Sequence, residues 1–292
     1  MSRSDNAVQR FLFENTDIRG ELVSLNNSYV EALVAHEYPE VVRHFLGELV
    51  ASAVLLSSTL KFEGLLTLQA RGDGPLSLLM VECTDKKSFR AVAQFREDIT
   101  EAPLQTLLGK SSLLITVDPV KGKRYQGIVP LEKETLAASL EDYFAQSVQL
   151  QTRLWLACDG QSCTGLLLQA LPASAELSAE ARSESWNRMT ALAETVQDSE
   201  LLDLDHETLL VRLFHEETVR IFDQEPVRFA CTCSRERSAR IISTLDRKEV
   251  ESIVEEEGQV ALDCQFCNHQ YAFGKEDIDM IFNKSFNNKT IH

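Results

Sequence analysis

Apolar and polar residues between positions 64 and 172 follow the two-residue period of β-strands. Five segments bounded by turn residues show this pattern: LLTLQA, LSLLMVEC, FRAVAQF, LLITVD and YQGIVPL. The sequences GDGP at 72–75 and KGK at 121–123 are typical of hairpin turns. Two further strands, TRLWLAC and TGLLLQAL, end this region near Pro172, and RGELV at 19–23 predicts an earlier strand. The pattern favours an α+β fold, with an antiparallel-sheet domain and packed helices over residues 1–175.

A helical period interrupts the strands at three places. Asn27 or Ser28 can cap a helix that runs to about His36, and Pro39 can occupy the first turn of a second helix. The second helix carries apolar residues on several faces, so we expect it to be largely buried. A third helix is predicted over roughly 134–146, with its apolar stripe formed by Leu136, Leu140, Tyr143 and Phe144.

The next region, 176–226, is helical in pattern but strongly acidic. Residues 176–225 hold thirteen acidic and four basic side chains. Two apolar stripes run through them, one formed by Trp186, Met189, Leu192 and Val196 and the other by Leu209, Leu210, Leu213 and Phe214. These stripes are consistent with an ordinary linker that packs two amphipathic helices on the core. They are also consistent with a conditionally stable linker, because repulsion among the carboxylates favours undocking. The pattern alone does not decide between the two.

The C-terminal region, 227–292, predicts a small separate module. Two helices are expected, at about 235–245 and 247–257, the second capped by Asp246 with Glu249 and ended by Gly258. Short strands at 259–263 and 270–273 and a helix at 276–282 complete it. A module of about 65 residues is too small to depend on its apolar core alone, so a bound metal is expected to supply much of its folding free energy.

Four cysteines in this module have the spacing of a zinc site. Cys231 and Cys233 form a CxC pair, and Cys264 and Cys267 form a CxxC pair after thirty intervening residues. Two close pairs joined by a long loop fill the four positions of tetrahedral Zn²⁺. We therefore expect one Zn²⁺ per chain, in a closed site that leaves no position for substrate.

The same thiolates are targets for oxidants. Oxidation most readily joins near neighbours, which pairs Cys231 with Cys233 and Cys264 with Cys267. By the chain-entropy estimate, each such disulfide restricts the unfolded chain by roughly 1.5–2 kcal/mol, against about 4 kcal/mol for a Cys231–Cys264 bridge. Structural zinc is worth on the order of 10–16 kcal/mol in small modules. Oxidation should therefore loosen the module and whatever docks against it, including the acidic stretch.

Several motifs resemble those of the heat-shock protein 33 (Hsp33) family, the redox-regulated holdase chaperones of bacteria. They are CTCSRER at 231–237, CQFC at 264–267, RGELV at 19–23, LKF at 60–62, GDGP at 72–75, RYQG at 124–127 and LEDYF at 140–144. The resemblance implies an ATP-independent chaperone, not an enzyme, that is inactive while reduced and zinc-loaded. It implies that oxidation releases zinc, forms the two local disulfides, unfolds the linker at 176–226 and exposes a surface for unfolded client proteins. Active members are typically homodimers.

Composition limits the partners and the compartment. The net charge of −16, and of −2 within residues 227–292, argues against a nucleic-acid binder of the zinc-ribbon class. The uncharged stretch 49–60 is too short to span a bilayer, and the N-terminus does not resemble a signal peptide. Seven cysteines without an export signal indicate a reducing cytoplasm.

The alternative of a thiol–disulfide oxidoreductase using Cys264 and Cys267 stays open, although tight zinc binding would occupy both thiols.

Other cysteines and histidines offer weaker candidates. Cys83 is interpreted as a small buried hydrophobe, whereas Cys158 and Cys163 flank a turn that could bring them close enough to pair under stress. Three histidines are not expected to be metal ligands: His269 is interpreted as a surface side chain, and His206 and His215 as solvated or partly buried.

Overall fold

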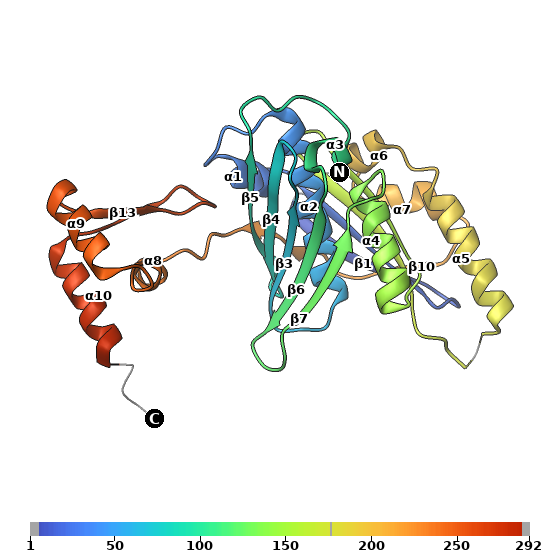
Figure 1. Ribbon diagram of the computed structural model, residues 1–292. Helices are drawn as coiled ribbons and strands as arrows, with labels where there is room; N and C mark the ends of the chain where they lie inside the picture. The colour runs from blue at the N-terminus through green and yellow to red at the C-terminus, as the bar shows by residue number, and fades with distance from the viewer. Residues whose placement is uncertain (1–5, 176, 288–292) are drawn as a thin grey trace. The chain divides into compact units, whose positions relative to one another are not determined.

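The protein is described by a computed structural model covering residues 6–175 and 177–287 (Figure 1). The chain forms two compact units, 1–230 and 231–292. The acidic stretch therefore belongs to the same unit as the strand-rich region. The second unit begins at Cys231, not at Val227, because residues 225–229 still pair with strands of the first unit.

Two mainly antiparallel sheets form the first unit, and they contain every strand predicted for it. One sheet has the order β10-β1-β2-β9-β8, with β11 also pairing with β1. The other has the order β12-β5-β4-β3-β6-β7, in which β12 pairs with β5 in parallel. The strands of the first sheet are β1 (Ala7–Phe13), β2 (Ile18–Leu25), β8 (Thr152–Cys158), β9 (Cys163–Ala170), β10 (Val219–Ile221) and β11 (Glu225–Pro226). Those of the second are β3 (Gly64–Arg71), β4 (Leu76–Thr84), β5 (Ser88–Phe95), β6 (Ser112–Pro119), β7 (Tyr125–Pro130) and β12 (Arg228–Phe229).

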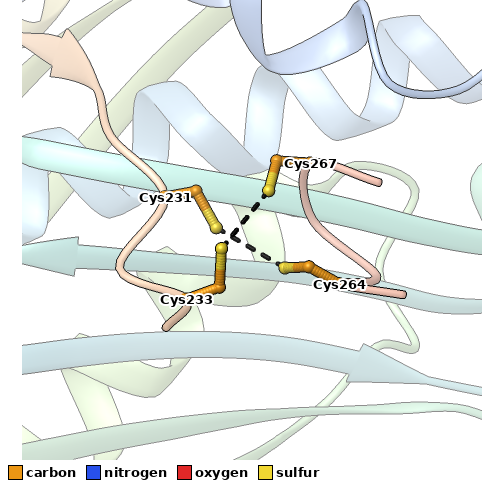
Figure 2. A group of neighbouring side chains, drawn as sticks. All are labelled: Cys231, Cys233, Cys264 and Cys267. Carbon is orange, nitrogen blue, oxygen red and sulfur yellow. Dashed lines mark hydrogen bonds between the residues drawn. The ribbon is translucent and has the colours of Figure 1, made fainter. Parts of the chain in front are cut away.

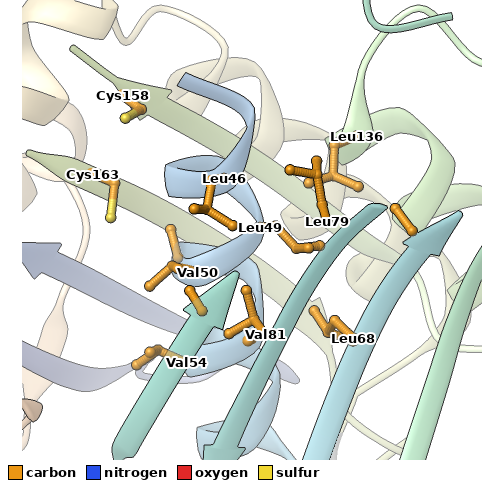
Figure 3. Close-up of a cluster of buried hydrophobic side chains, with 14 of the residues drawn as sticks. Leu46, Leu49, Val50, Val54, Leu68, Leu79, Val81, Leu136, Cys158 and Cys163 are labelled. Atoms are coloured by element: carbon orange, nitrogen blue, oxygen red, sulfur yellow. The ribbon is translucent and has the colours of Figure 1, made fainter. Parts of the chain in front are cut away.

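Helix α2 (Glu40–Thr59) packs against strands of both sheets and forms the centre of the main core. Figure 3 shows Leu46, Leu49 and Val50 of α2 among side chains of the neighbouring strands. By length and composition α2 could cross a membrane, but 67% of that stretch is buried inside the protein. The prediction of a largely buried helix is confirmed.

The other helices of this region differ from the predictions at their ends. Helix α1 (Asn27–Leu33) has Asn26 in the N-cap position without a side-chain capping bond, so the predicted cap at Asn27 or Ser28 is wrong. The helix ends three residues before His36, and Pro39 is the residue before α2. The predicted helix at 134–146 is α4 (Leu136–Tyr143), which continues as a wider π-helical turn, η1 (Phe144–Val148). Its predicted apolar stripe is buried. A short helix, α3 (Leu104–Leu108), was not predicted.

The acidic stretch holds three helices, not two: α5 (Ala179–Ala193), α6 (Asp198–Asp203) and α7 (His206–Phe214). They form one side of the first unit (Figure 1) and share a second apolar core with the outer face of the β1-β2-β9-β8 sheet. Met189, Leu209, Leu213 and Phe214 are buried there, which confirms the predicted stripes. We call residues 176–226 the linker.

The second unit contains the predicted elements in the predicted order. They are α8 (Arg235–Ile242), α9 (Arg247–Glu257), the hairpin β13 (Val260–Asp263) and β14 (Gln270–Phe273), and α10 (Lys275–Asn287). The Asp246 carboxylate accepts the backbone N–H groups of Lys248 and Glu249, and Gly258 ends α9 in the left-handed conformation, as predicted. Seven buried side chains make up its core: Ile242, Val250, Val254, Val260, Phe273, Ile278 and Phe282.

Candidate metal centre

The second unit brings the four predicted cysteines together. Their Sγ atoms all lie within 4.8 Å of one another (Figure 2). The Cys231–Cys264 and Cys233–Cys267 sulfur pairs are 3.6 and 3.5 Å apart. Four thiolates at 2.3 Å from a tetrahedral Zn²⁺ would be about 3.8 Å apart. The cluster therefore has the size of a four-thiolate metal site, and it can hold a metal ion.

The helix that follows the CxC pair restrains its position. Cys231 and Cys233 lie in extended chain directly before α8, whose N-cap Ser234 accepts the Arg237 N–H. The Arg237 guanidinium donates to the Thr232 carbonyl and hydroxyl, at 3.0 and 2.8 Å. These bonds hold the residue between the two cysteines, so both sulfurs project from a restrained loop.

The CxxC half is the turn of the β13–β14 hairpin. The Cys264 N–H donates to the His269 carbonyl at 3.0 Å, and the Asn268 N–H donates to the Cys264 carbonyl at 2.8 Å. Asn268 has φ +55°, a left-handed conformation that asparagine tolerates better than most residues. This tight turn directs Cys264 and Cys267 to the same side as the CxC pair.

Electrostatics inside the cluster favour a cation. Burial and hydrogen bonds with the other three cysteines raise the pKa of the Cys267 thiol well above its usual range. The hydroxyl of Tyr271 donates to Cys233 Sγ at 3.2 Å, and this bond raises the pKa of Tyr271 to about 12. Thiols this close together stay protonated until a cation balances the negative charge of the thiolates. A divalent metal ion supplies that positive charge. All four cysteines are half-buried, so an oxidant can reach them.

A second polar site lies where the linker meets the sheet, and it corrects a prediction. His206, expected to be solvated or partly buried, is only 1% exposed. Its ring lies between Ser24 Oγ at 3.0 Å and Gln9 Oε1 at 3.1 Å, and burial lowers its pKa to about 4. The neutral imidazole thus attaches the start of α7 to β1 and β2.

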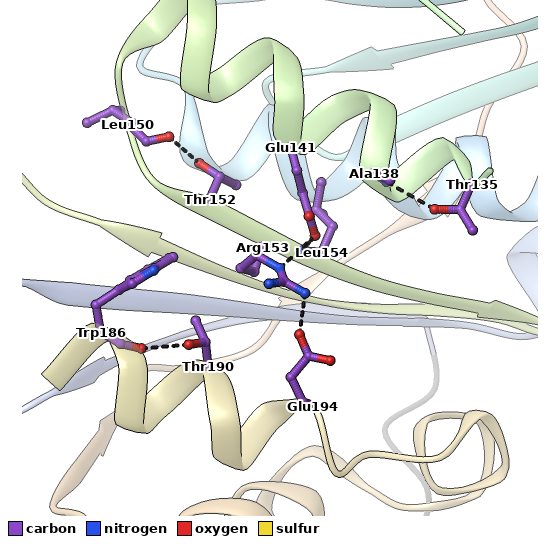
Figure 4. A network of polar contacts seen from close by, with 10 residues as sticks. All are labelled: Thr135, Ala138, Glu141, Leu150, Thr152, Arg153, Leu154, Trp186, Thr190 and Glu194. Carbon is purple, nitrogen blue, oxygen red and sulfur yellow. Dashed lines mark hydrogen bonds and ion pairs between the residues drawn. The ribbon is translucent and has the colours of Figure 1, made fainter. Parts of the chain in front are cut away.

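An arginine on the edge strand β8 makes a further contact with the linker. The Arg153 guanidinium pairs with Glu141 of α4 at 3.2 Å and with Glu194, the residue that ends α5 (Figure 4). Glu141 also accepts the Leu154 N–H at 2.7 Å. Burial raises the pKa of the Glu141 carboxyl, and the Leu154 N–H and Arg153 counteract that shift.

The remaining candidates are placed as follows. His269 and His215 are exposed, and the His269 ring packs against Tyr271 instead of joining the cluster. Cys83 is fully buried beside Ser57, as predicted. Cys158 and Cys163 are buried and lie directly opposite each other on β8 and β9.

Comparisons with known proteins agree with this architecture. The family model described as Hsp33 protein matches residues 6–274. A 33 kDa chaperonin of Ectopseudomonas mendocina is 51% identical over 277 residues, which is 94% of each chain. That of Pseudomonas aeruginosa PAO1 is 51% identical over 97% of this chain and 96% of its own.

The fold agrees as well. The crystal structure of the 33 kDa chaperonin (heat shock protein 33 homolog) of Thermotoga maritima superposes with a TM-score of 0.81. It covers 97% of this chain and 99% of that chain at 20% identity, and therefore supports the α+β fold alone. The motifs, the relatives and the fold lead to one conclusion: this chain belongs to the Hsp33 family of chaperones.

Proposed function

We propose that the protein is a redox-regulated, ATP-independent holdase whose reduced form is inactive. Cys231, Cys233, Cys264 and Cys267 are its zinc ligands and its redox switch. The observation that carries the proposal is the cluster of four half-buried sulfurs in a unit whose apolar core is small. When bound, Zn²⁺ supplies a closed cross-link between the CxC loop and the CxxC turn.

Oxidation converts each close cysteine pair to a disulfide. Two thiols lose two protons and two electrons to the oxidant; with peroxide the products are one disulfide and two waters. The oxidised sulfurs are no longer thiolates and cannot keep the metal. The second unit then loses a metal cross-link that stabilises it by on the order of 10–16 kcal/mol. Each of the two disulfides that replace the metal closes a short loop and stabilises the unit by only roughly 1.5–2 kcal/mol. We infer that this loss loosens residues 231–292.

The linker is the second half of the proposed switch. Its helices cover the apolar outer face of a sheet and would expose it on undocking. The buried residues on that face include Phe11, Phe13, Leu22, Leu166 and Leu168, which would offer an apolar surface to unfolded client proteins. Thirteen acidic residues against four basic ones in residues 176–225 add self-repulsion that favours the undocked linker.

The remaining expectations belong to the same proposal. The active form is a homodimer that binds unfolded or partly unfolded proteins, binds no nucleic acid and works without enzymatic turnover. A cytoplasmic location fits the proposal because a reducing compartment keeps thiols available for the metal.

One experiment tests the switch. Reduced, zinc-loaded protein is treated with hypochlorous acid or warm peroxide, and zinc release and suppression of client aggregation are measured on the same sample. We expect about one zinc to leave per chain as holdase activity appears, and a thiol reductant with zinc to reverse both. Zinc release without protection of clients would refute the switch, and so would protection with zinc still bound.

Two further assays separate the alternatives. An oxidoreductase using Cys264 and Cys267 would reduce insulin disulfides catalytically, whereas the proposed holdase would not. A nucleic-acid binder would show salt-dependent affinity for DNA or RNA. The net charge of −2 in residues 227–292 gives no basic field for such binding.

A further inference from the structure

Two cysteines outside the metal cluster face each other at the end of a hairpin. Cys158 is the last residue of β8, Cys163 is the first of β9, and the two are register partners. Gly160 takes φ +83° in the turn between them. Figure 3 shows both side chains on neighbouring strands beside α2.

The hydrogen-bond pattern of the ladder determines what kind of pair they form. The Asp159 N–H donates to the Ser162 carbonyl at 3.1 Å, and the Ala170 N–H donates to the Gln151 carbonyl at 2.9 Å. Hydrogen-bonded and non-hydrogen-bonded pairs alternate in an antiparallel ladder, so the Cys158 pair is non-hydrogen-bonded. Such pairs have Cα atoms about 4.5 Å apart, within the range that a disulfide spans.

Both side chains converge on one point of α2. A Cβ at Gly47 would lie 2.3 Å from Cys158 Sγ and 3.1 Å from the Cβ atoms of both cysteines. The glycine therefore leaves the space that the two thiols occupy. The Cβ atoms are close neighbours and both point into the same packed layer.

The closed fold protects these thiols. Cys158 is 6% exposed and Cys163 is fully buried. Burial raises the pKa of Cys158 to about 12 and that of Cys163 well above its usual range. Thiolate is the reactive form, so reaction requires the hairpin end to open. β8 is an edge strand of its sheet, and such an edge opens at lower cost than the interior.

We propose that Cys158 and Cys163 are a second oxidation site, which forms a cross-strand disulfide when peroxide reaches the warmed, transiently open hairpin. Cys158 first reacts with peroxide to give a sulfenic acid and water. The Cys163 thiol then attacks the Cys158 sulfur, which forms the disulfide and releases a second water. Two thiols are oxidised and one peroxide is reduced.

The disulfide would join two strands that carry part of the linker's docking surface. Ala157 and Leu166, on β8 and β9, belong to the apolar core that the linker covers. A bond between these strands would hold that surface in register while neighbouring elements loosen.

The test uses the full-length, reduced, zinc-loaded protein and peptide mass mapping after thiol alkylation. Samples are treated with peroxide at ambient temperature and just below the onset of unfolding. We expect the peptide spanning 158–163 to lose the mass of two hydrogen atoms, several-fold faster in the warm sample, and dithiothreitol to restore both alkylatable thiols. Of the seven cysteines, Cys83 would then be the one still reduced after full oxidation.

A matched pair of variants separates the disulfide from general oxidation. Cys163→Ala removes the resolving thiol, whereas Cys83→Ala removes a buried thiol on β4 whose register partners are Leu66 and Phe89. We compare the change in melting temperature of the first unit on oxidation, and expect it to be more positive by a few degrees in the wild type and in Cys83→Ala than in Cys163→Ala. Cys158→Ala should behave like Cys163→Ala and replaces it if that variant does not fold.

Two results would overturn the proposal. In one, Cys158 and Cys163 stay alkylatable in the warm sample although the four C-terminal cysteines are oxidised. In the other, Cys158 accumulates as sulfinic acid while Cys163 stays reduced. Because the signal comes from the 158–163 peptide, neither result bears on the C-terminal cysteines.

Discussion

The two apolar cores of the first unit are built differently. The core around α2 lies between two sheets, and thirteen of the twenty residues of that helix are buried. The core under the linker has the sheet on one side only, and α5 buries just Met189 and Ala193 among its fifteen residues. Free energies of local opening follow such differences in burial. The linker is therefore the part of this unit that should open first, while the α2 core remains folded.

The largest expected effect comes from removing one of the two proposed metal ligands in the CxxC turn. We expect Cys264→Ser to lose most of its bound zinc, because three thiolates and a hydroxyl make a much weaker site. Hydrogen exchange should then become fast throughout residues 231–287. Zinc stoichiometry and exchange mass spectrometry measure both effects.

The matched control is His269→Ala, which alters an exposed neighbour of the same turn. It should keep one zinc per chain. Unchanged zinc binding in Cys264→Ser would contradict the four-thiolate assignment.

The second prediction weakens the linker's core directly. Phe214 is 1% exposed, and its ring packs on Phe13 with centroids 4.8 Å apart. Phe214→Ala should cost about 3–5 kcal/mol of docking free energy. We expect faster hydrogen exchange in α5–α7 and holdase activity in the reduced, zinc-bound protein.

Val211→Ala, in the same helix, is the control because Val211 is 65% exposed. Val50→Ala, in the core around α2, gives the matching measurement for that core. It should lower the free energy of global unfolding without selective opening of the linker. Reduced Phe214→Ala that stays fully docked would show that this core is not what holds the linker.

The third prediction is a pH dependence. His206 has its pKa lowered from 6.5 to about 4, so the folded state favours the neutral ring. Its contribution is fully present above pH 6.5 and is lost as the pH falls towards 4. The total loss is up to about 3 kcal/mol, of which about 1 kcal/mol is lost by pH 5.5.

Linker exchange measured from pH 7.5 to 5 should rise accordingly, after correction for intrinsic exchange rates. Gln9 and Ser24, which contact the ring, are neutral, and the nearby Asp205 carboxylate opposes the shift. His206→Gln should flatten this dependence, whereas His215→Gln should leave it unchanged because His215 is exposed. An identical pH profile in wild type and His206→Gln would exclude the histidine as the cause.

The smallest effect is expected at Arg153. Its ion pairs with Glu141 and Glu194 involve side chains that are partly exposed, so each contributes less than about 1 kcal/mol. Arg153→Gln should shift linker exchange slightly, and less so at high salt. A shift as large as that of Phe214→Ala would mean that charge, and not apolar burial, dominates docking.

The sequence predicted best where a local pattern determines the structure. Two-residue periods located the long strands except β1 (Ala7–Phe13), which was not predicted, and the spacing of Cys231, Cys233, Cys264 and Cys267 identified the cluster before its geometry was known. Caps such as Asp246 and Gly258 were correct because a few neighbouring residues determine them.

It failed where partners distant in sequence decide the outcome. His206 is buried because Gln9, 197 residues away, meets its ring. Strands β10, β11 and β12 have only two or three residues each, which is too short for a periodic signal. Their positions depend on pairing with β1 and β5.

Those three short strands also determine how the linker is tethered. The Ala230 N–H, directly before Cys231, donates to the Phe89 carbonyl, and the Val227 N–H donates to the Asn6 carbonyl. Further back, Val219–Ile221 pairs with residues 11–13 of β1. The pairings of β12, β11 and β10 each involve only two or three residues, and these strands follow one another along the chain. Tension applied at Cys231 would therefore break the pairings one at a time, from β12 back to β10, before it reached α7.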